Sequence, residues 1–487
     1  MNKVKKLILF MVTFVVCLLP LFNWSHVNAA EDSLQKIKDK GTLVVGMSAD
    51  FPPYEFTVKE NGQTKFVGMD VDIIKQFAKD IGVKVEIKNM NFDSLLVALE
   101  TNKIDCIISG MNPSPERKKS VDFSDIYYKS KQYLIINKAD KNKYKTYKDL
   151  TGKAVGAQSG SIQYDIVKNN IDDVEIKGLT KLNDLVLALQ SHKVDAVAMD
   201  EPTAKAYAAN NGMVALDPKW KDVGDTDGTA IAFPKGSTSL VQAANKTIAK
   251  IKKDKLIDKK YLPSAGEYMN KNSANKTMWH YWTYFAKGIE YTLLITVLSV
   301  FFGFILGTLL ALLRLSNSKF LRGIAIAYIE FVRGTPLMVQ VMFIYFGVGA
   351  IIQSLPALLA GIIATSLNSG AYVAEVIRSG ISSIDVGQTE AARSLGMSQK
   401  DTYRYVIIPQ ALKNIWPALG NEFITLIKES SIVSIIGVTD LMYQSQLVQS
   451  ATYRGVVPLF ITMMIYFVMT FGLSKLLGLL ERKMKHD

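Results

Sequence analysis

The chain has 487 residues, a net charge of +13 and an apolar fraction of 49%. Its basic residues form no run interleaved with aromatics, which argues against nucleic-acid binding; lysines on solvated faces and basic residues beside membrane spans explain the charge more simply. Two cysteines, Cys17 and Cys106, are too few for a disulfide framework, and no spacing of Cys and His fits a metal site.

The first thirty residues have the features of an export signal. Three lysines precede an apolar run over 7–22, and small residues then offer a cleavage site near Ala29 or Ala30. The alternative is an uncleaved anchor. With either outcome, we expect the residues that follow to lie outside the cell.

Residues 31–262 alternate short apolar strands with amphipathic helices. The letters TLVVGMS, VKVEIKNM and DCIIS predict strands separated by helices, and the pattern returns with a helix over LNDLVLALQSHK and a strand at DAVAM. Two α/β lobes of comparable design are therefore predicted. We expect the extended stretches 132–137 and 228–234 to be the two crossings between the lobes.

Four segments of this half carry a family resemblance: DFPPYEF, GMDVDI, GMNPSPERKKSVDFS and DAVAMDEP. As a set they resemble the extracytoplasmic solute-binding proteins for polar amino acids, over essentially all of 31–262. The resemblance implies a two-lobed fold, like that of periplasmic binding proteins, that closes on a free L-amino acid.

Such a ligand carries a carboxylate and an ammonium group at a fixed separation, so the site must supply donors and an acceptor. Arg117 can bond the carboxylate through two N–H groups, and backbone N–H groups near Gly110 and Asn112 can complete the cradle. Asp200 ends a predicted strand, where ligands bind in such sheets, and can accept from the ammonium. The resemblance gives these positions the same roles. The alternatives are a surface charge at Arg117 and a helix-start carboxylate at Asp200, with Glu201 as its competitor.

The second lobe and two aromatic residues complete the expected site. Gly160 and Ile162 bound a stretch that offers further backbone donors. Phe51 and Phe92 are expected to sandwich the aliphatic stem of the ligand, and a plain core role is the alternative for both.

Three positions, Ser48, Asp50 and Gln158, lie where the family discriminates between ligand side chains. A carboxylate at Asp50 would attract a basic ligand, whereas Gln158 suits an amide. The sequence therefore ranks glutamine-like ligands first and basic ligands second, with little separation between them.

The second half of the chain begins with a polar linker, 263–285, and continues as a transmembrane domain over 286–487. Five spans are predicted, the second beginning somewhere in 323–337, from apolar runs at 289–313, 337–352, 357–377, 415–438 and 456–480. Because the first span enters from outside, an odd number of spans puts the C-terminus inside. The basic residues after spans one, three and five agree with this orientation.

The segment GQTEAARSLGMSQKDTYRYVIIPQAL, residues 387–412, lies between spans three and four and is too polar for lipid. Glu390, Ala391 and Ala392, followed by Gly396 and the letters VIIP, resemble the EAA loop of ABC importer permeases. The resemblance implies that the small-faced helix lies in a groove on a separate ATPase subunit, while Gly396 permits a turn into a second helix. An ordinary amphipathic interface helix is the alternative.

Two polar helix faces lie within the predicted spans. Asn368 and Glu375 share one face with Tyr372, and Glu422 and Glu429 share another. Ionisable groups inside a membrane are expensive and usually face the bundle interior, so both faces are predicted to line the translocation path. Hydrogen bonding between helices or subunits is an equally supported alternative.

The sequence therefore predicts an α/β two-lobed binding domain followed by an all-α transmembrane domain of about five helices. The resemblances imply an amino acid ABC importer subunit in the plasma membrane, with its binding domain on the extracellular face of a Gram-positive-type bacterium. Five spans per chain imply a homodimer. The only Gly-Lys pair, Gly152 and Lys153, lacks the rest of a phosphate loop, so we expect no cofactor in this chain and a separate ATPase that binds ATP and Mg.

Two other functions are alternatives. A ligand-gated ion channel of the glutamate-receptor type uses a similar binding fold, but its spans interrupt the two lobes, whereas both lobes here finish before the first span. An enzyme built on the same lobes would need a cleft acid with a raised pKa, and the sequence singles none out.

Overall fold

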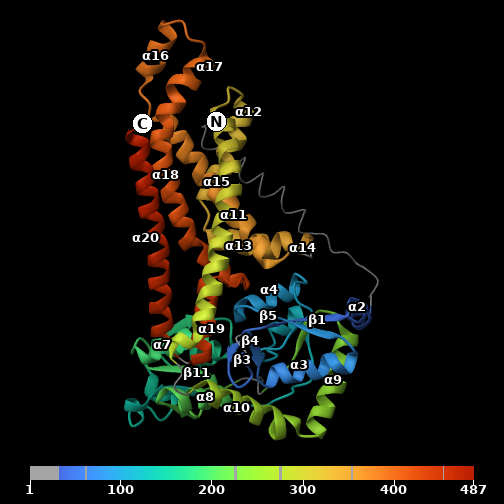
Figure 1. The fold of residues 1–487 in the computed structure, drawn as a ribbon. Helices are drawn as coiled ribbons and strands as arrows, with labels where there is room; N and C mark the ends of the chain where they lie inside the picture. Colours follow the sequence, from blue (N-terminus) through green and yellow to red (C-terminus); the bar gives the residue numbers. More distant parts are fainter. Residues whose placement is uncertain are drawn as a thin grey trace.

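Residues 32–273 form two α/β lobes, and residues 277–486 form a helical bundle that contacts the lobes at one end (Figure 1). The computed structural model describes residues 32–60, 63–223, 228–273, 277–352, 355–452 and 454–486. The predicted export signal, 1–30, lies outside the described residues. The predicted fold class is confirmed, because a two-lobed α/β domain precedes an all-α domain.

The first lobe is built on a five-stranded sheet with the order β5-β1-β6-β13-β7, in which β1 runs parallel to β5 and β6. Its helix α3 buries Ile73, Ile74 and Phe77 on one face and ends at Gly82, whose φ is +79°. The elements of this lobe are α2 (Ser33–Lys40), β1 (Thr42–Met47), β2 (Asp50–Phe51), β3 (Glu55–Glu60), β4 (Gln63–Val67), α3 (Met69–Ile81), β5 (Lys84–Asn89), α4 (Leu95–Glu100), β6 (Cys106–Ile107), α5 (Arg117–Ser120), β7 (Val121–Phe123), β13 (Ala232–Pro234) and α9 (Thr238–Lys253).

The second lobe repeats the design with the sheet order β10-β9-β11-β8-β12, in which β9 runs parallel to β10 and β11. Its strands and helices are β8 (Gln132–Asn137), β9 (Ala154–Gln158), α6 (Ile162–Asn170), β10 (Glu175–Leu179), α7 (Leu182–Gln190), β11 (Ala196–Asp200), α8 (Glu201–Asn211) and β12 (Met213–Leu216).

One stretch expected to cross between the lobes is instead a strand, and the other is a crossing at its start and a strand at its end. Residues 132–137 form β8, which pairs with β11, and Ala232–Pro234 form β13 in the first lobe. The chain crosses just before each strand, and Tyr128 and Thr229 form an isolated antiparallel bridge there. Apolar letters alone do not separate a crossing from a buried strand.

The expected polar linker is helical at its start. Residues Leu262–Ser273 form α10, where the sequence predicts a polar linker. Ala265 and Met269, four residues apart, are buried in one cluster with Phe56 and Val58 of β3. This pair docks the helix on the first lobe, and the same cluster includes Ala206 of the second lobe and the partly buried Tyr268.

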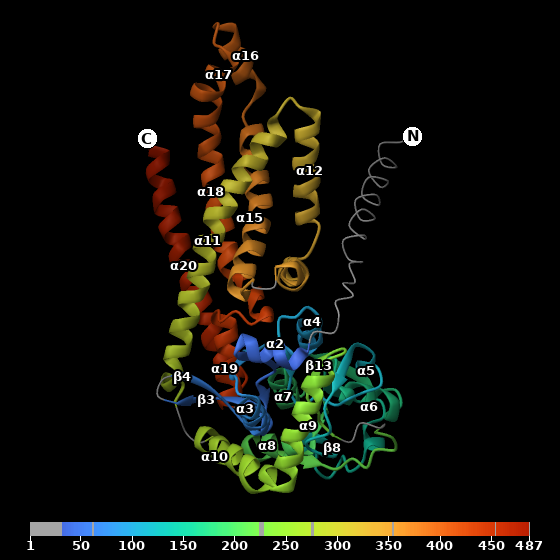
Figure 2. The ribbon, with the colours of Figure 1, turned by 90° about the vertical axis from the view of Figure 1, so that its right-hand side faces the viewer.

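The membrane half consists of helices, the longer of which run side by side (Figure 2). They are α11 (Trp282–Leu315), α12 (Lys319–Arg333), α13 (Leu337–Met342), α14 (Gly349–Ile351), α15 (Ala357–Ser382), α16 (Val386–Ser394), α17 (Gln399–Asp401), α18 (Ile408–Glu429), α19 (Leu441–Thr452) and α20 (Val456–His486). Glycines let α11 approach α15 closely: a Cβ at Gly303 would lie 2.7 Å from Ser369 Oγ, and one at Gly307 would lie 2.6 Å from Val373.

Three helices among the described residues are long and apolar enough to cross a membrane, and a bent pair would make a fourth. The three cover 278–315, 357–382 and 456–479, and the pair joins α12 to 337–348 at an angle of 105°. The second apolar run therefore does not form a straight span. The fourth run, 415–438, is also divided, because α18 ends at Glu429 and a tighter 3₁₀ segment, Ser430–Ile436, follows.

Different parts of the protein lie at the two ends of the helical bundle. Figure 1 shows the lobes at one end, and α16, α17 and the C-terminal end of α20 at the other. The segment that resembles the EAA loop therefore lies far from the binding domain.

Candidate functional site

A cavity lies between the lobes, where loops that follow parallel strands of both sheets meet. Its lining residues are Ser48, Asp50, Phe51, Glu55, Phe92, Ser109, Gly110, Asn112, Arg117, Gln158, Ser161, Ile162 and Gln163. Seven of the nine predicted substrate-binding residues are among them. The other two are next to it: Gly160 bonds Arg117, and Asp200 bonds Gln163.

Arg117 is buried in this cleft, with 7% of its surface exposed, so it is not a surface charge. Its Nη1 donates to Asn112 O and its Nη2 to Gly160 O of the other lobe, both at 2.7 Å. The guanidinium lies 5.5 Å from the centroid of the Phe92 ring, and the Asn112 side chain donates to Gly228 O. Burial lowers the pKa of Arg117 to about 10, so the side chain is a cation at neutral pH.

Asp200 ends β11 and is completely buried. Its Oδ1 accepts hydrogen bonds from Gln132, the facing residue on β8, and from Gln163, while its Oδ2 accepts none from the described residues. Burial raises the pKa of Asp200 to about 7, against the opposing effect of Gln132, Tyr54 and Gln163. The competing Glu201 instead pairs with Lys205 at 2.6 Å. A bound ammonium group would satisfy the open oxygen of Asp200.

Two buried carboxyl groups that the sequence analysis misses lie beside the cavity. Glu55 lines it and accepts a hydrogen bond from Ser109 Oγ at 2.6 Å. Asp70 accepts from the Gly110 N–H and the Tyr127 hydroxyl, both at 2.8 Å. Burial and the charge of Asp70 raise the pKa of Glu55 well above its usual range, and burial raises that of Asp70 to about 6. A glutamate inside an apolar strand is the sequence signal for such a group.

Gly110 contributes to the shape of the cavity, and its backbone N–H is not available as a donor to a ligand. Its φ is +54°, and a Cβ there would lie 2.8 Å from the Phe51 ring. Its own N–H already bonds a buried carboxylate, so a carboxylate cradle at this position needs other donors. Phe51 stacks on Tyr54 with ring centroids 5.2 Å apart, and both Phe51 and Phe92 line the cavity.

The residues expected to read the ligand side chain are engaged within the protein. Asp50 accepts the Ser48 hydroxyl at 2.8 Å and, from the second lobe, the N–H of Leu182 at 3.0 Å. Gln158 donates from Nε2 to Thr180 O at 3.1 Å. Asp50 therefore holds the two lobes together, and its carboxylate is less available to a basic ligand than the sequence suggests.

The polar face of α15 makes contacts between helices. Asn368 donates from Nδ2 to Gln340 Oε1 at 3.1 Å, and the Arg333 guanidinium lies 5.6 Å from the Tyr372 ring centroid. Glu375 forms ion pairs with three arginines of three helices. They are Arg314 and Arg378, each at 2.6 Å, and Arg333 at 3.9 Å. Of the two readings of this face, these contacts favour hydrogen bonding and ion pairing between helices over a path lining.

The second predicted face is different. Glu422 and Glu429 lie half-buried on α18, and neither takes part in a hydrogen bond or ion pair found among the described residues. Asn421 and Lys428 beside them are exposed. Unpaired ionisable groups on a membrane helix need water or another protein surface, so a role in the path stays a prediction for α18.

The loop beyond the bundle has the predicted helix-break-helix form. α16 ends at Ser394, Gly396 has a φ of +83°, and the next helix begins after Ser398, whose hydroxyl accepts the Asp401 N–H at 3.1 Å. The break at Gly396 is therefore confirmed. A residue with a Cβ would be strained at this φ.

The loop also leaves a surface open. Glu390 and Ala391 are exposed, whereas Ala392 is buried. Two apolar side chains are strongly exposed, Val386 at 70% and Leu395 at 84%. Apolar side chains grouped at the end of the bundle indicate a contact surface for another protein.

Comparisons with known proteins assign the two halves separately. Residues 43–264 match the family model of the bacterial extracellular solute-binding proteins, family 3. Residues 273–486 match that of the binding-protein-dependent transport system inner membrane component.

Two relatives, one matching each half, agree with this division. A permease of Rickettsia felis, named for a glutamine transport system, is 41% identical over 202 residues, which are 41% of this chain and 93% of that protein. The arginine-binding extracellular protein ArtP of Bacillus subtilis is 36% identical over 226 residues, 45% of this chain and 84% of ArtP. A solved amino acid ABC transporter substrate-binding protein of Streptococcus pneumoniae, bound to L-arginine, is 36% identical, with coverage of 49% and 98% and a TM-score of 0.47.

Proposed function

The chain belongs to the ABC importers of polar amino acids in which a family 3 solute-binding domain is fused to the permease, and on this premise we propose that it captures a polar L-amino acid between its lobes and forms the membrane path for it. ATP hydrolysis by a separate ATPase subunit, with its own Mg, would drive transport. The glutamate-receptor type of channel is not favoured, because both lobes end before α11 begins.

The observation that carries the proposal is a pair of opposite charges buried around one cleft. Arg117 and Asp200 are both buried, and one oxygen of Asp200 accepts no hydrogen bond from the described residues. Buried charges are costly unless they are paired. The main-chain carboxylate and ammonium of a free amino acid would pair with Arg117 and Asp200, with its stem between Phe51 and Phe92.

For the ligand side chain we place a basic amino acid ahead of a glutamine-like one, which reverses the order that the sequence favours. Glu55 lines the cavity with a buried carboxyl group, and a guanidinium or ammonium group beside it would favour its ionised form and pair with it. The arginine-binding relative of Bacillus subtilis supports this order. The amide of Gln158 is the feature that supports the glutamine-like alternative.

The test is calorimetry of the full-length chain in lipid nanodiscs, titrated with each of the twenty common L-amino acids. We expect heat from one or a few polar amino acids, with L-arginine binding more tightly than L-glutamine. The absence of heat from all twenty would overturn the ligand assignment, and tighter binding of L-glutamine would restore the order that the sequence favours.

Coupling to the ATPase is assigned to the loop around Glu390, Ala391, Ala392 and Gly396. Its exposed apolar side chains would fit a groove on the partner, and the left-handed φ of Gly396 makes the turn sensitive to substitution. Gly396→Asp should leave amino acid binding intact while it uncouples uptake from ATP hydrolysis. Unchanged uptake in proteoliposomes would contradict the coupling role.

The assembly and its orientation are also proposals. We divide the chain into an export signal (1–30), an extracellular binding domain (31–262), a linker (263–285) and a permease domain (286–487) in the plasma membrane of a Gram-positive-type bacterium. A homodimer would cover the polar side of α18, where Asn421 and Lys428 are exposed. Thiol labelling of intact cells should reach a cysteine at Lys118 but not one at Glu390; equal labelling would contradict the orientation.

A further inference from the structure

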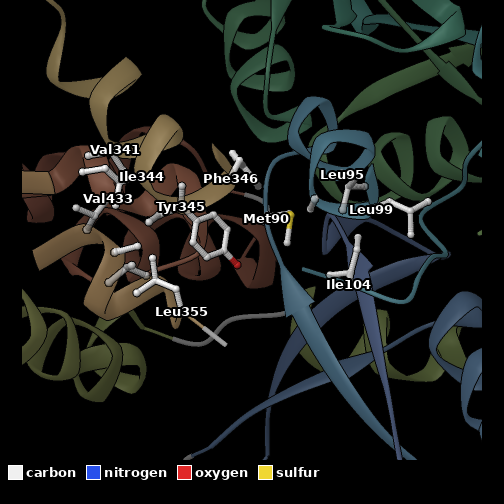
Figure 3. Packing of buried hydrophobic residues seen from close by; sticks show 14 of the residues in the cluster. Met90, Leu95, Leu99, Ile104, Val341, Ile344, Tyr345, Phe346, Leu355 and Val433 are labelled. Atoms are coloured by element: carbon white, nitrogen blue, oxygen red, sulfur yellow. The ribbon is translucent and has the colours of Figure 1, made fainter. Parts of the chain in front are cut away.

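The first lobe of the binding domain contacts the helical bundle through a continuous apolar surface. Met90, Leu95, Leu99 and Ile104 of this lobe belong to one buried cluster with residues of the bundle, and Figure 3 shows the two sets side by side. On the bundle side the cluster includes Val341, Ile344, Tyr345, Phe346, Leu355 and Val433. Burial of this kind is the main stabilising contribution in stable association.

Polar contacts strengthen the same surface. Lys103 is 4% exposed, and its Nζ donates to Ile352 O at 3.3 Å and to Leu355 O at 3.5 Å. Asn89 donates from Nδ2 to the Tyr443 hydroxyl at 2.9 Å. A lysine buried this deeply must keep its donors bonded, so the first lobe has a large free-energy cost for leaving the bundle.

The second lobe meets the bundle differently, through the helix α7 alone among the contacts described. Asn183 donates from Nδ2 to Ser450 Oγ at 2.6 Å, and Leu187 packs so closely on Gly455 that a Cβ there would lie 2.9 Å from it. The buried apolar clusters of this lobe include no bundle residue among those described. This contact is therefore small and can be made and broken.

One helix of the bundle, α19, touches both lobes. Tyr443 and Ser450 are seven residues apart, about two turns, and so lie on one face of it. Tyr443 bonds Asn89 of the first lobe, whereas Ser450 bonds Asn183 of the second. A second cavity lies between this face and the two lobes, and Asp50 lines both this cavity and the candidate ligand site.

The position of Asn183 depends on closure of the cleft. Its Oδ1 lies 2.8 Å from the Tyr207 hydroxyl, which is also 3.1 Å from the carbonyl oxygen of Asp50 in the first lobe. The neighbouring Leu182 donates its N–H to the Asp50 carboxylate. If the lobes part, the contacts of Asp50 with Tyr207 and Leu182 break and α7 moves away from Ser450.

We propose that α19 detects closure of the binding domain: the first lobe stays docked on the bundle, and Asn183 reaches Ser450 only when the second lobe has closed. This inference rests on the proposed function, which assigns closure to amino acid binding. The segment Ser430–Ile436 joins α19 to α18, and α18 continues from the exposed loop at the far end of the bundle. The closed state thus has a direct structural connection to the proposed coupling loop.

The test is cross-linking in the full-length chain in nanodiscs with Cys17 replaced by serine; Cys106 is buried and does not interfere. Asn183→Cys together with Ser450→Cys reports the contact of the second lobe with α19. Asn89→Cys together with Tyr443→Cys, joined by a short bis-thiol reagent, reports the contact of the first lobe with α19. With saturating L-arginine or L-glutamine, whichever binds, the second-lobe pair should cross-link at least about fivefold faster than without amino acid. The first-lobe pair should change by less than about twofold.

Equal rates for the second-lobe pair with and without amino acid, in a variant that still binds it by calorimetry, would overturn this inference and leave the proposed function standing. Loss of all binding in the unmodified chain would overturn the proposed function. As a functional readout, Ser450→Ala should weaken amino acid binding by less than about tenfold, because the closed state loses one hydrogen bond, and should reduce the stimulation of ATP hydrolysis by amino acid. Ser191→Ala, at the exposed end of α7, is the matched control and should change neither.

Discussion

Carboxylates lie inside both halves of the chain, in different surroundings. In the binding half, Asp200 is completely buried among glutamine side chains, and one of its oxygens accepts no hydrogen bond from the described residues. In the membrane half, Glu375 has arginines from three helices around it, two of them at 2.6 Å. The Asp200 carboxylate is open to a positively charged ligand group, whereas the Glu375 carboxylate is already neutralised by arginines.

This difference separates a binding site from a scaffold. A buried charge without a partner raises the free energy of the protein. A ligand that supplies the opposite charge lowers it again, and this difference contributes to binding affinity and selectivity. A charge paired within the protein adds nothing to binding, but its loss leaves its partners unpaired. The charge of Arg117 and the open oxygen of Asp200 belong to the first kind, and Glu375 belongs to the second.

The strongest test removes the cation of the cleft. Arg117→Ala should weaken amino acid binding at least about 100-fold, because a buried charge-assisted pair is lost. Lys118→Ala, the exposed neighbour, is the matched control and should change the Kd by less than about twofold. Calorimetry on both variants measures the effect. Similar affinities of the two variants would mean that the ligand binds elsewhere. The charge of Arg117 would then not be kept for a ligand, and the contrast with the paired Glu375 would not hold.

The pH dependence tests Asp200 next. Because its pKa is raised to about 7 and the ligand ammonium needs the carboxylate, binding requires proton release at lower pH. Affinity should fall by up to about tenfold per pH unit below pH 7 and level off above it. Stability of the protein alone has the opposite sign: burial favours the protonated form, so this contribution falls as pH rises towards about 7. Asp200→Asn should remove the pH dependence; an unchanged profile in this variant would exclude Asp200.

Much of the fold could be predicted because the chain repeats simple patterns. The strand at Thr42–Met47 and the helix at Leu182–Gln190 follow directly from apolar runs and helical spacing. The α10 helix was missed because its apolar residues are few: Ala265 and Met269 are buried, and Tyr268 is partly buried beside them. The bend of 105° after α12 lies at Gly334 and Pro336, which mark a helix break in the sequence but do not fix its angle.

The candidate site was predictable where one residue type matches one chemistry. Arg117 in a family motif pointed to a carboxylate, and the structure places it in the cleft. Glu55 and Gln163 were missed because their roles depend on burial and on neighbours from distant segments. Asp50 was read as a ligand contact, yet its partner Leu182 comes from the other lobe, which no local pattern reveals.

Ligand selectivity sharpens the comparison further. Glu55→Gln removes a carboxyl group that lines the cavity, so the preference for L-arginine over L-glutamine should fall by about tenfold. Glu60→Gln changes the exposed end of the same strand and should leave the preference unchanged. The measurement is the ratio of the two Kd values by calorimetry. An unchanged ratio in Glu55→Gln would mean that the ligand side chain is read by other residues.

The smallest effect on binding is expected in the membrane half. Glu375→Gln leaves the guanidinium groups of Arg314, Arg333 and Arg378 without their shared anion, and should lower the free energy of unfolding by about 1 to 3 kcal/mol. The midpoint of thermal unfolding in nanodiscs measures this loss, with Glu330→Gln, exposed on α12, as the control. The Kd for amino acid should not change, because the paired carboxylate serves the scaffold. A shift in Kd with an unchanged midpoint would instead assign Glu375 to the transport path, as the sequence analysis first proposed.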